Sequence, residues 1–135
     1  MPAKDRDHDV VIRALAADGW RITHEQYAIV LPERRMWIDI RATRAAEERI
    51  ILVEVKGFAK ATSSVEYLSA TLGQYLIYRV SLDYNDETTP IYLAVPNESY
   101  NGILSETLGQ LVLQRFAIPL IVFDRETERI IRWIP

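Results

Sequence analysis

The sequence contains no cysteine, and no hydrophobic run in it is long enough to cross a bilayer. The lack of cysteine excludes a disulfide framework and any metal site built from thiolates. Residues 1–9 are too polar for a signal peptide, so we expect a cytoplasmic protein without a membrane-spanning segment. The formal net charge of −3 gives the chain no general excess of positive charge, which nucleic-acid-binding domains often carry.

The rest of the composition indicates a single domain that covers residues 1–135. Hydrophobic residues make up 49% of the 135, which is enough for a sizeable core. Positive side chains are concentrated in the first sixty residues, whereas acidic residues dominate the remainder. This distribution permits a phosphate-bearing ligand near the first half of the chain.

The residue pattern predicts an α/β sandwich with a central mixed sheet. Helices are expected over residues 7–17, 64–82 and 98–116, the last in two pieces that are broken near Ser105 or Gly109. Strands are expected over residues 20–23, 27–31, 35–41, 50–55, 90–96, 120–123 and 129–134. The connection over residues 42–48 is too short for a parallel crossover, so the two strands that it joins should pair antiparallel.

Two details of the helices can be checked against a structure. Gly19 follows the first helix and is suited to a left-handed C-cap. The helix over residues 64–82 is expected to bury one apolar face, made of Val65, Leu68, Leu72, Leu76 and Ile77.

Two of the expected strands each carry a single carboxylate inside an apolar run. Asp39 lies between two isoleucines, and Glu54 lies within the run Ile-Ile-Leu-Val-Glu-Val. A charge buried without a partner costs several kcal/mol, so each carboxylate needs either a satisfying neighbour or a functional reason. Lys56 lies two residues after Glu54 and therefore faces the same side of the strand.

These three groups together predict a metal-dependent hydrolytic site. If the two strands share register, the carboxylates face each other across about 5 Å and repel unless a cation lies between them. Mg²⁺ (or Mn²⁺) accepts such oxygen ligands, and Asp39 and Glu54 would be those ligands. Lys56 could orient or deprotonate a metal-bound water or neutralise negative charge on a phosphodiester. A solvated Glu-x-Lys ion pair at a sheet edge remains the alternative.

The arrangement resembles the PD-(D/E)XK nuclease superfamily, which has a restriction-endonuclease-like fold. In that pattern a helix precedes a hairpin that carries Asp and then Glu-x-Lys, matched here by Asp39, Glu54 and Lys56. Ile38 stands where the motif has its proline. His8 lies in the first helix, where some members of the superfamily have a glutamate.

A second element of the resemblance lies in the long helix. Gln74 and Tyr78 match the Gln-x-x-x-Tyr element that follows the lysine strand in one branch of these nucleases. At a spacing of four they share a helix face, so the pair could steady Lys56 or a phosphate. An ordinary surface glutamine beside a tyrosine at the edge of the core remains the alternative.

Nearly the whole chain is similar to the XisH family, the controlling factors for excision of the fdxN element in cyanobacteria. The matching stretches include Asp18-Gly-Trp-Arg-Ile-Thr-His24, Val53-Glu-Val-Lys56, Leu72-Gly-Gln-Tyr75, Tyr92-Leu-Ala-Val-Pro96, Leu108-Gly-Gln-Leu-Val-Leu113 and the ending Ile121-Val-Phe-Asp…Trp133-Ile-Pro135. The resemblance implies a part in site-specific DNA rearrangement, with DNA and a companion protein of the XisI type as partners.

Three functions stay open at this point. The chain could be a metal-dependent nuclease, a catalytically silent module that binds DNA or the companion protein, or a structural partner that is stable mainly in a complex. A homodimer is also compatible with the sequence.

Overall fold

The computed structural model describes residues 3–57 and 64–135 and contains a six-stranded mixed sheet. The strands lie in the order β1-β2-β3-β4-β5-β6, and their bounds are β1 Arg21–Val30, β2 Arg35–Arg44, β3 Arg49–Val55, β4 Ile91–Pro96, β5 Leu120–Asp124 and β6 Arg129–Ile134. The pairs β3–β4 and β4–β5 are parallel and the other neighbours are antiparallel. The predicted α/β class with a mixed sheet is confirmed, as is the antiparallel pairing of β2 with β3.

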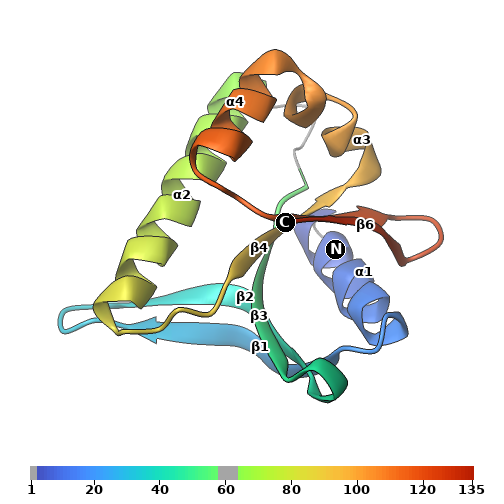
Figure 1. The fold of residues 1–135 in the computed structure, drawn as a ribbon. Coiled ribbons are helices and arrows are strands. Elements are labelled where there is room, and N and C mark those ends of the chain that lie inside the picture. Colours follow the sequence, from blue (N-terminus) through green and yellow to red (C-terminus); the bar gives the residue numbers. More distant parts are fainter. Residues whose placement is uncertain (1–2, 58–63) are drawn as a thin grey trace.

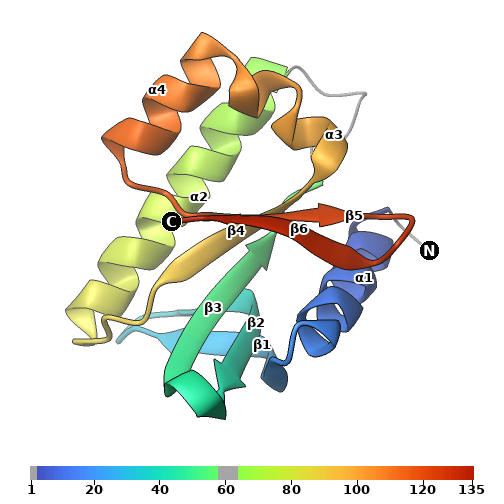
Figure 2. The same cartoon turned by 45° about the vertical axis from the view of Figure 1, so that its right-hand side comes forward.

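Helices cover both faces of this sheet. Helix α1 (Ala3–Ala17) lies on one face, and α2 (Ser64–Tyr84) and α4 (Thr107–Arg115) lie on the other (Figures 1 and 2). Shorter elements are the helix α3 (Asn97–Tyr100) and the 3₁₀ turns Ala45–Glu47 and Ile103–Ser105. Within the described ranges, no helix is long and apolar enough to cross a membrane.

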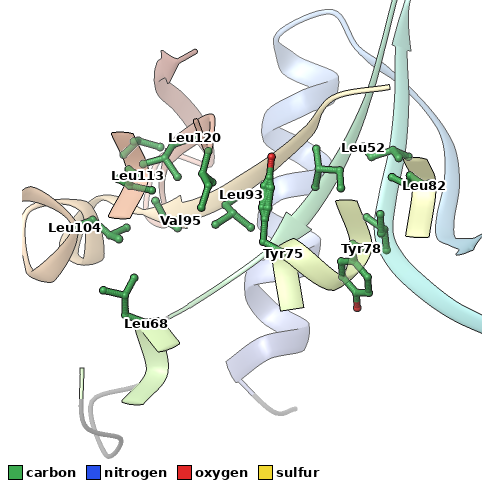
Figure 3. Close-up of a cluster of buried hydrophobic side chains, with 14 of the residues drawn as sticks. Leu52, Leu68, Tyr75, Tyr78, Leu82, Leu93, Val95, Leu104, Leu113 and Leu120 are labelled. Carbon is green, nitrogen blue, oxygen red and sulfur yellow. The ribbon is translucent and has the colours of Figure 1, made fainter. Parts of the chain in front are cut away.

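Two hydrophobic clusters fill the spaces between these layers. Beneath α1, Val11 and Leu15 pack with residues such as Val53 and Phe123. Beneath α2, four helix residues pack with the sheet (Figure 3): Leu68, Tyr75, Tyr78 and Leu82. Strand β4 is buried along its whole length because it lies in the middle of the sheet with a helix layer on each face, which explains its continuous apolar sequence.

The predicted buried face of α2 is partly wrong. Val65 and Ile77 are 54% and 53% exposed, whereas Tyr75 and Tyr78 are each only 7% exposed. The helix carries apolar residues around most of its circumference, so helical spacing alone could not select the face that packs on the sheet. Tyr75 and Tyr78, which pack on the sheet, are larger side chains than Val65 and Ile77, which were expected to do so.

The strands of the first hairpin are longer and more continuous than the sequence indicates. The predicted interruption at residues 24–26 is wrong, because β1 is one strand with a bulge between Ile22 and His24 and a positive φ of 83° at Gln26. Strand β2 also continues past residue 41, to Arg44. Strand β1 is an edge strand with mostly exposed side chains, so polar residues there do not prevent pairing of its backbone with β2.

The turn and helix-end predictions fare better. Gly19 follows α1 with φ 89°, as expected of a left-handed cap. The region over residues 98–116 is broken near Ser105, as predicted, but into three elements rather than two, namely α3, the 3₁₀ turn that ends at Ser105, and α4, which begins at Thr107. Helix α1 begins at Ala3 rather than at residue 7.

The corrected face of α2 gives a stability prediction. Leu82→Ala should lower the free energy of unfolding by about 2–5 kcal/mol, because Leu82 is 1% exposed and its removal leaves a cavity. Ile77→Ala on the same helix should change it by no more than about 0.5 kcal/mol, because that side chain faces solvent. Urea unfolding monitored by circular dichroism measures both, and equal losses would contradict the observed orientation of α2.

Candidate active site

The two predicted carboxylates lie where β2 and β3 stop pairing through their backbones. The ladder between these strands runs from Arg44 opposite Arg49 to Ile40 opposite Val53. Asp39 and Glu54 occupy the next position, where side-chain oxygens accept the hydrogen bonds between the two strands. The backbone N–H of Asp39 donates to Glu54 Oε1 at 3.2 Å, and the backbone N–H of Val55 donates to Asp39 Oδ2 at 2.9 Å. Each carboxylate thus accepts a backbone N–H from the neighbouring strand at the point where the ladder of backbone pairs ends.

This exchange changes the direction of the Asp39 side chain. Ile38 packs in the cluster beneath α2 and Ile40 in the cluster beneath α1, although residues two apart on a regular strand face the same side. Asp39 therefore lies at an irregularity of β2 and extends along the sheet toward β3. Both carboxylates are buried, with Asp39 7% and Glu54 3% exposed.

Lys56 supplies the positive charge nearest to this pair among the described contacts. Its Nζ lies 3.7 Å from Glu54 Oε2, and 15% of its side chain is exposed. Its backbone N–H donates to the carbonyl of Ala94 at 2.9 Å, so the chain just after β3 stays hydrogen-bonded to β4 beyond the last β2–β3 pair. The structure therefore brings Asp39, Glu54 and Lys56 together at one end of the β2–β3 ladder.

The electrostatics of the pair favour a proton or a cation. Burial and the nearby negative charge of Asp39 raise the pKa of Glu54 to about 7, although the ammonium group of Lys56 acts in the opposite direction. One lysine therefore does not neutralise both carboxylates. A proton held between the two acids, or a metal ion, would remove the remaining repulsion.

The α2 side of the site is formed by Tyr78 and Gln74. Burial and the charges of Glu54 and Asp39 raise the pKa of Tyr78 to about 12, so its hydroxyl stays protonated beside the carboxylates. Gln74 Nε2 donates to this hydroxyl at 2.9 Å. Gln74 Oε1 is buried and has no hydrogen-bond partner in the described part of the chain. Lys56 contacts Glu54, and no contact that joins it to Gln74 is present among the described residues.

The first helix contributes differently from the prediction. His8 Nε2 lies 3.3 Å from Glu25 Oε1 of β1, so it joins α1 to the hairpin rather than contacting the two carboxylates. Asp7, which the sequence pattern did not single out, is 4% exposed and binds Arg125 through both oxygens. Asp7 lies in a polar stretch with other acidic residues, so the local sequence does not indicate that its side chain is buried.

The oxygen donors fit a hard divalent cation. Backbone hydrogen bonds occupy Asp39 Oδ2 and Glu54 Oε1, and Glu54 Oε2 lies 3.7 Å from Lys56 Nζ. No group of three or more His, Asp or Glu that could hold a metal occurs in residues 3–57 and 64–135. Mg²⁺ commonly binds through one or two carboxylates and completes its shell with water and phosphate oxygens, so this pair would be sufficient.

The raised pKa of Glu54 gives a pH prediction. The ordinary pKa of 4.5 applies in the unfolded chain and about 7 in the folded one, so the folded protein binds more protons between these values. This group therefore makes the free energy of unfolding fall as pH rises through that window. In chelator-treated protein, Glu54→Gln should remove this contribution, whereas Glu126→Gln in the exposed β5–β6 turn should not. Urea unfolding across the window measures it, and identical pH profiles for the two variants would contradict the assignment.

Comparisons with known proteins agree on one family. The family model described as XisH protein matches residues 1–131. The crystal structure of an fdxN element excision controlling factor protein from Anabaena variabilis is 32% identical with a TM-score of 0.89, over 97% of this chain and 99% of that one. An XisH family protein from Nostoc punctiforme PCC 73102 is 31% identical with a TM-score of 0.88, over 97% and 100% of the two chains.

No curated protein matches the chain. The family model covers nearly all of the sequence, and both structural relatives exceed 30% identity over their full length. The chain belongs to the XisH family.

Proposed function

We propose that this protein is an excision controlling factor that acts on DNA in a site-specific rearrangement and carries a Mg²⁺-dependent phosphodiesterase site. The observation that carries the proposal is the buried pair of Asp39 and Glu54 with Lys56 beside it. A structural role would need neither two desolvated carboxylates at one point nor a pKa of about 7 at Glu54. The role in rearrangement rests on the relative from Anabaena variabilis, whose structure is described as that of an fdxN element excision controlling factor.

The residues divide into three tasks. Asp39 and Glu54 would hold the divalent cation through their remaining oxygens. When bound, such a cation polarises a phosphoryl oxygen and lowers the pKa of a bound water. Lys56 Nζ lies 3.7 Å from Glu54 Oε2, and Lys56 would stabilise negative charge on the phosphate.

Tyr78 and Gln74 support this arrangement from α2. The Tyr78 hydroxyl remains a hydrogen-bond donor near the carboxylates because its pKa is raised to about 12. Gln74 Nε2 donates to that hydroxyl, and its Oε1, which has no partner among the described residues, could accept a hydrogen bond from Lys56 or from a water on the phosphate. Both are therefore supporting residues rather than ligands of the cation.

The alternative is a catalytically silent nuclease fold that binds DNA or a companion protein of the XisI type. The described residues supply only two carboxylates to the site, and the net charge of −3 does not favour DNA binding by itself. In that case DNA or partner binding would survive the loss of Lys56, and the wild-type protein would leave every DNA substrate intact.

Metal binding can be tested without turnover. Saturation with Mn²⁺ or Mg²⁺ should stabilise the wild-type protein by about 2.7 kcal/mol at a concentration one hundred times the dissociation constant. Glu54→Gln should abolish the gain because it removes a charged ligand, and Glu126→Gln should retain it. A thermal melt with and without the metal gives the answer, and equal stabilisation of both variants would place the metal elsewhere.

Cleavage tests the role of Lys56. Lys56→Ala should lower the rate of Mg²⁺-dependent cleavage of linear, nicked or branched DNA by about 10²–10³-fold, as expected for the loss of one group that stabilises transition-state charge. Arg115→Ala, an exposed cation on α4, is the control and should cleave like wild type. Equal background cleavage by wild type and Lys56→Ala would exclude a catalytic lysine at this position.

A further inference from the structure

We propose that Asp7 and Arg125 form a clamp that positions Lys56 by fixing the backbone of Gly57, the next residue. Neither residue lies on β2 or β3, and neither belongs to the acid and lysine pattern of the site. The catalytic consequence of the clamp rests on the proposed function, whereas the clamp itself rests on contacts of Asp7, Arg125, Ser99 and Gly57.

The ion pair is bidentate and largely buried on its acidic side. Arg125 Nε lies 2.8 Å from Asp7 Oδ1 and Arg125 Nη2 lies 2.9 Å from Asp7 Oδ2. Arg125 comes from the turn after β5 and Asp7 from the first turns of α1, so the pair joins two distant parts of the chain. A planar guanidinium that binds both carboxylate oxygens holds its partner in one orientation.

Gly57 packs directly against this carboxylate. A Cβ atom at position 57 would lie 2.7 Å from Asp7 Oδ2, which is closer than non-bonded atoms approach each other. A side chain at position 57 would therefore push the Asp7 carboxylate from its place beside Arg125. The backbone at Gly57 therefore packs against a carboxylate that Arg125 holds in one orientation.

The carbonyl of Gly57 is held as well. Ser99 Oγ donates to it at 3.2 Å, and Arg125 Nη2 approaches it at 3.5 Å, the long end of the hydrogen-bond range. On the other side, the N–H of Lys56 is bonded to Ala94. The backbone of Lys56 is thus fixed before and after its Cα, which limits where its long flexible side chain can place the ammonium group.

A second ion pair provides a matched control. Arg13 Nε lies 3.0 Å from Glu128 Oε1, and Arg13 Nη2 lies 2.6 Å from Glu128 Oε2. This bidentate ion pair also joins α1 to the β5–β6 hairpin. Among the described residues, no contact links it to Gly57. Removal of Arg13 therefore breaks a similar link between the same elements without releasing the clamp.

The experiment compares Arg125→Ala and Gly57→Ala with Arg13→Ala. Gly57→Ala keeps both charges and only forces a methyl group against Asp7, so it tests the clamp if Arg125→Ala does not fold. Amide hydrogen exchange at Lys56 should accelerate about tenfold or more in both clamp variants, relative to Leu52 in β3, and remain unchanged in Arg13→Ala. Mn²⁺ binding should be retained by all three, while DNA cleavage should fall about 10²-fold in the clamp variants alone.

The outcomes separate the clamp from the proposed function. Unchanged exchange at Lys56 in both clamp variants, or equal acceleration in Arg13→Ala, would overturn the clamp. Cleavage at the wild-type rate by a folded clamp variant would overturn it as well. If the wild-type protein neither binds Mn²⁺ nor cleaves DNA, the proposed function fails, and the exchange at Lys56 still decides whether Asp7 and Arg125 position that residue.

Discussion

Two buried carboxylates that accept hydrogen bonds from each other's strands determine how this end of the sheet is built. Asp39 accepts from Val55, Glu54 accepts from Asp39, and the backbone ladder between β2 and β3 ends at that point. Without these donors, burial of the two acids would cost several kcal/mol, and only partial compensation comes from Lys56. The remaining strain is electrostatic, and it appears as the raised pKa of Glu54.

The surrounding layers keep this end of the sheet rigid. Tyr78 covers it from α2, and a bidentate ion pair joins α1 to the turn after β5 beside Gly57, the residue that follows Lys56. The hairpin of β1 and β2 leans toward the end of α2, where Asn85 donates to the carbonyl of Val30 at 3.0 Å. Residues of α1, α2, β2, β3 and the turn after β5 thus lie around Asp39, Glu54 and Lys56, an arrangement that would preorganise the proposed site.

The sequence predicted the elements and the central residues better than the details that connect them. Isolated charges in apolar strands made Asp39 and Glu54 conspicuous, and the spacing of two placed Lys56 beside Glu54. Strand alternation could not reveal that β2 is irregular at Asp39, where the side chain accepts from β3 and Gln26 with its positive φ lies opposite on β1. Asp7 was missed because its partner Arg125 lies more than one hundred residues away, and contacts at such separation leave no local pattern.

The most direct test of the central claim is a crystal of the protein soaked in Mn²⁺ and measured at a wavelength where manganese scatters anomalously. We expect an anomalous peak between Asp39 and Glu54, within coordination distance of an oxygen of each, and its loss in Glu54→Gln. A saturated crystal with no peak at these carboxylates, or with a peak that persists in Glu54→Gln, would contradict a metal site at the end of the β2–β3 ladder.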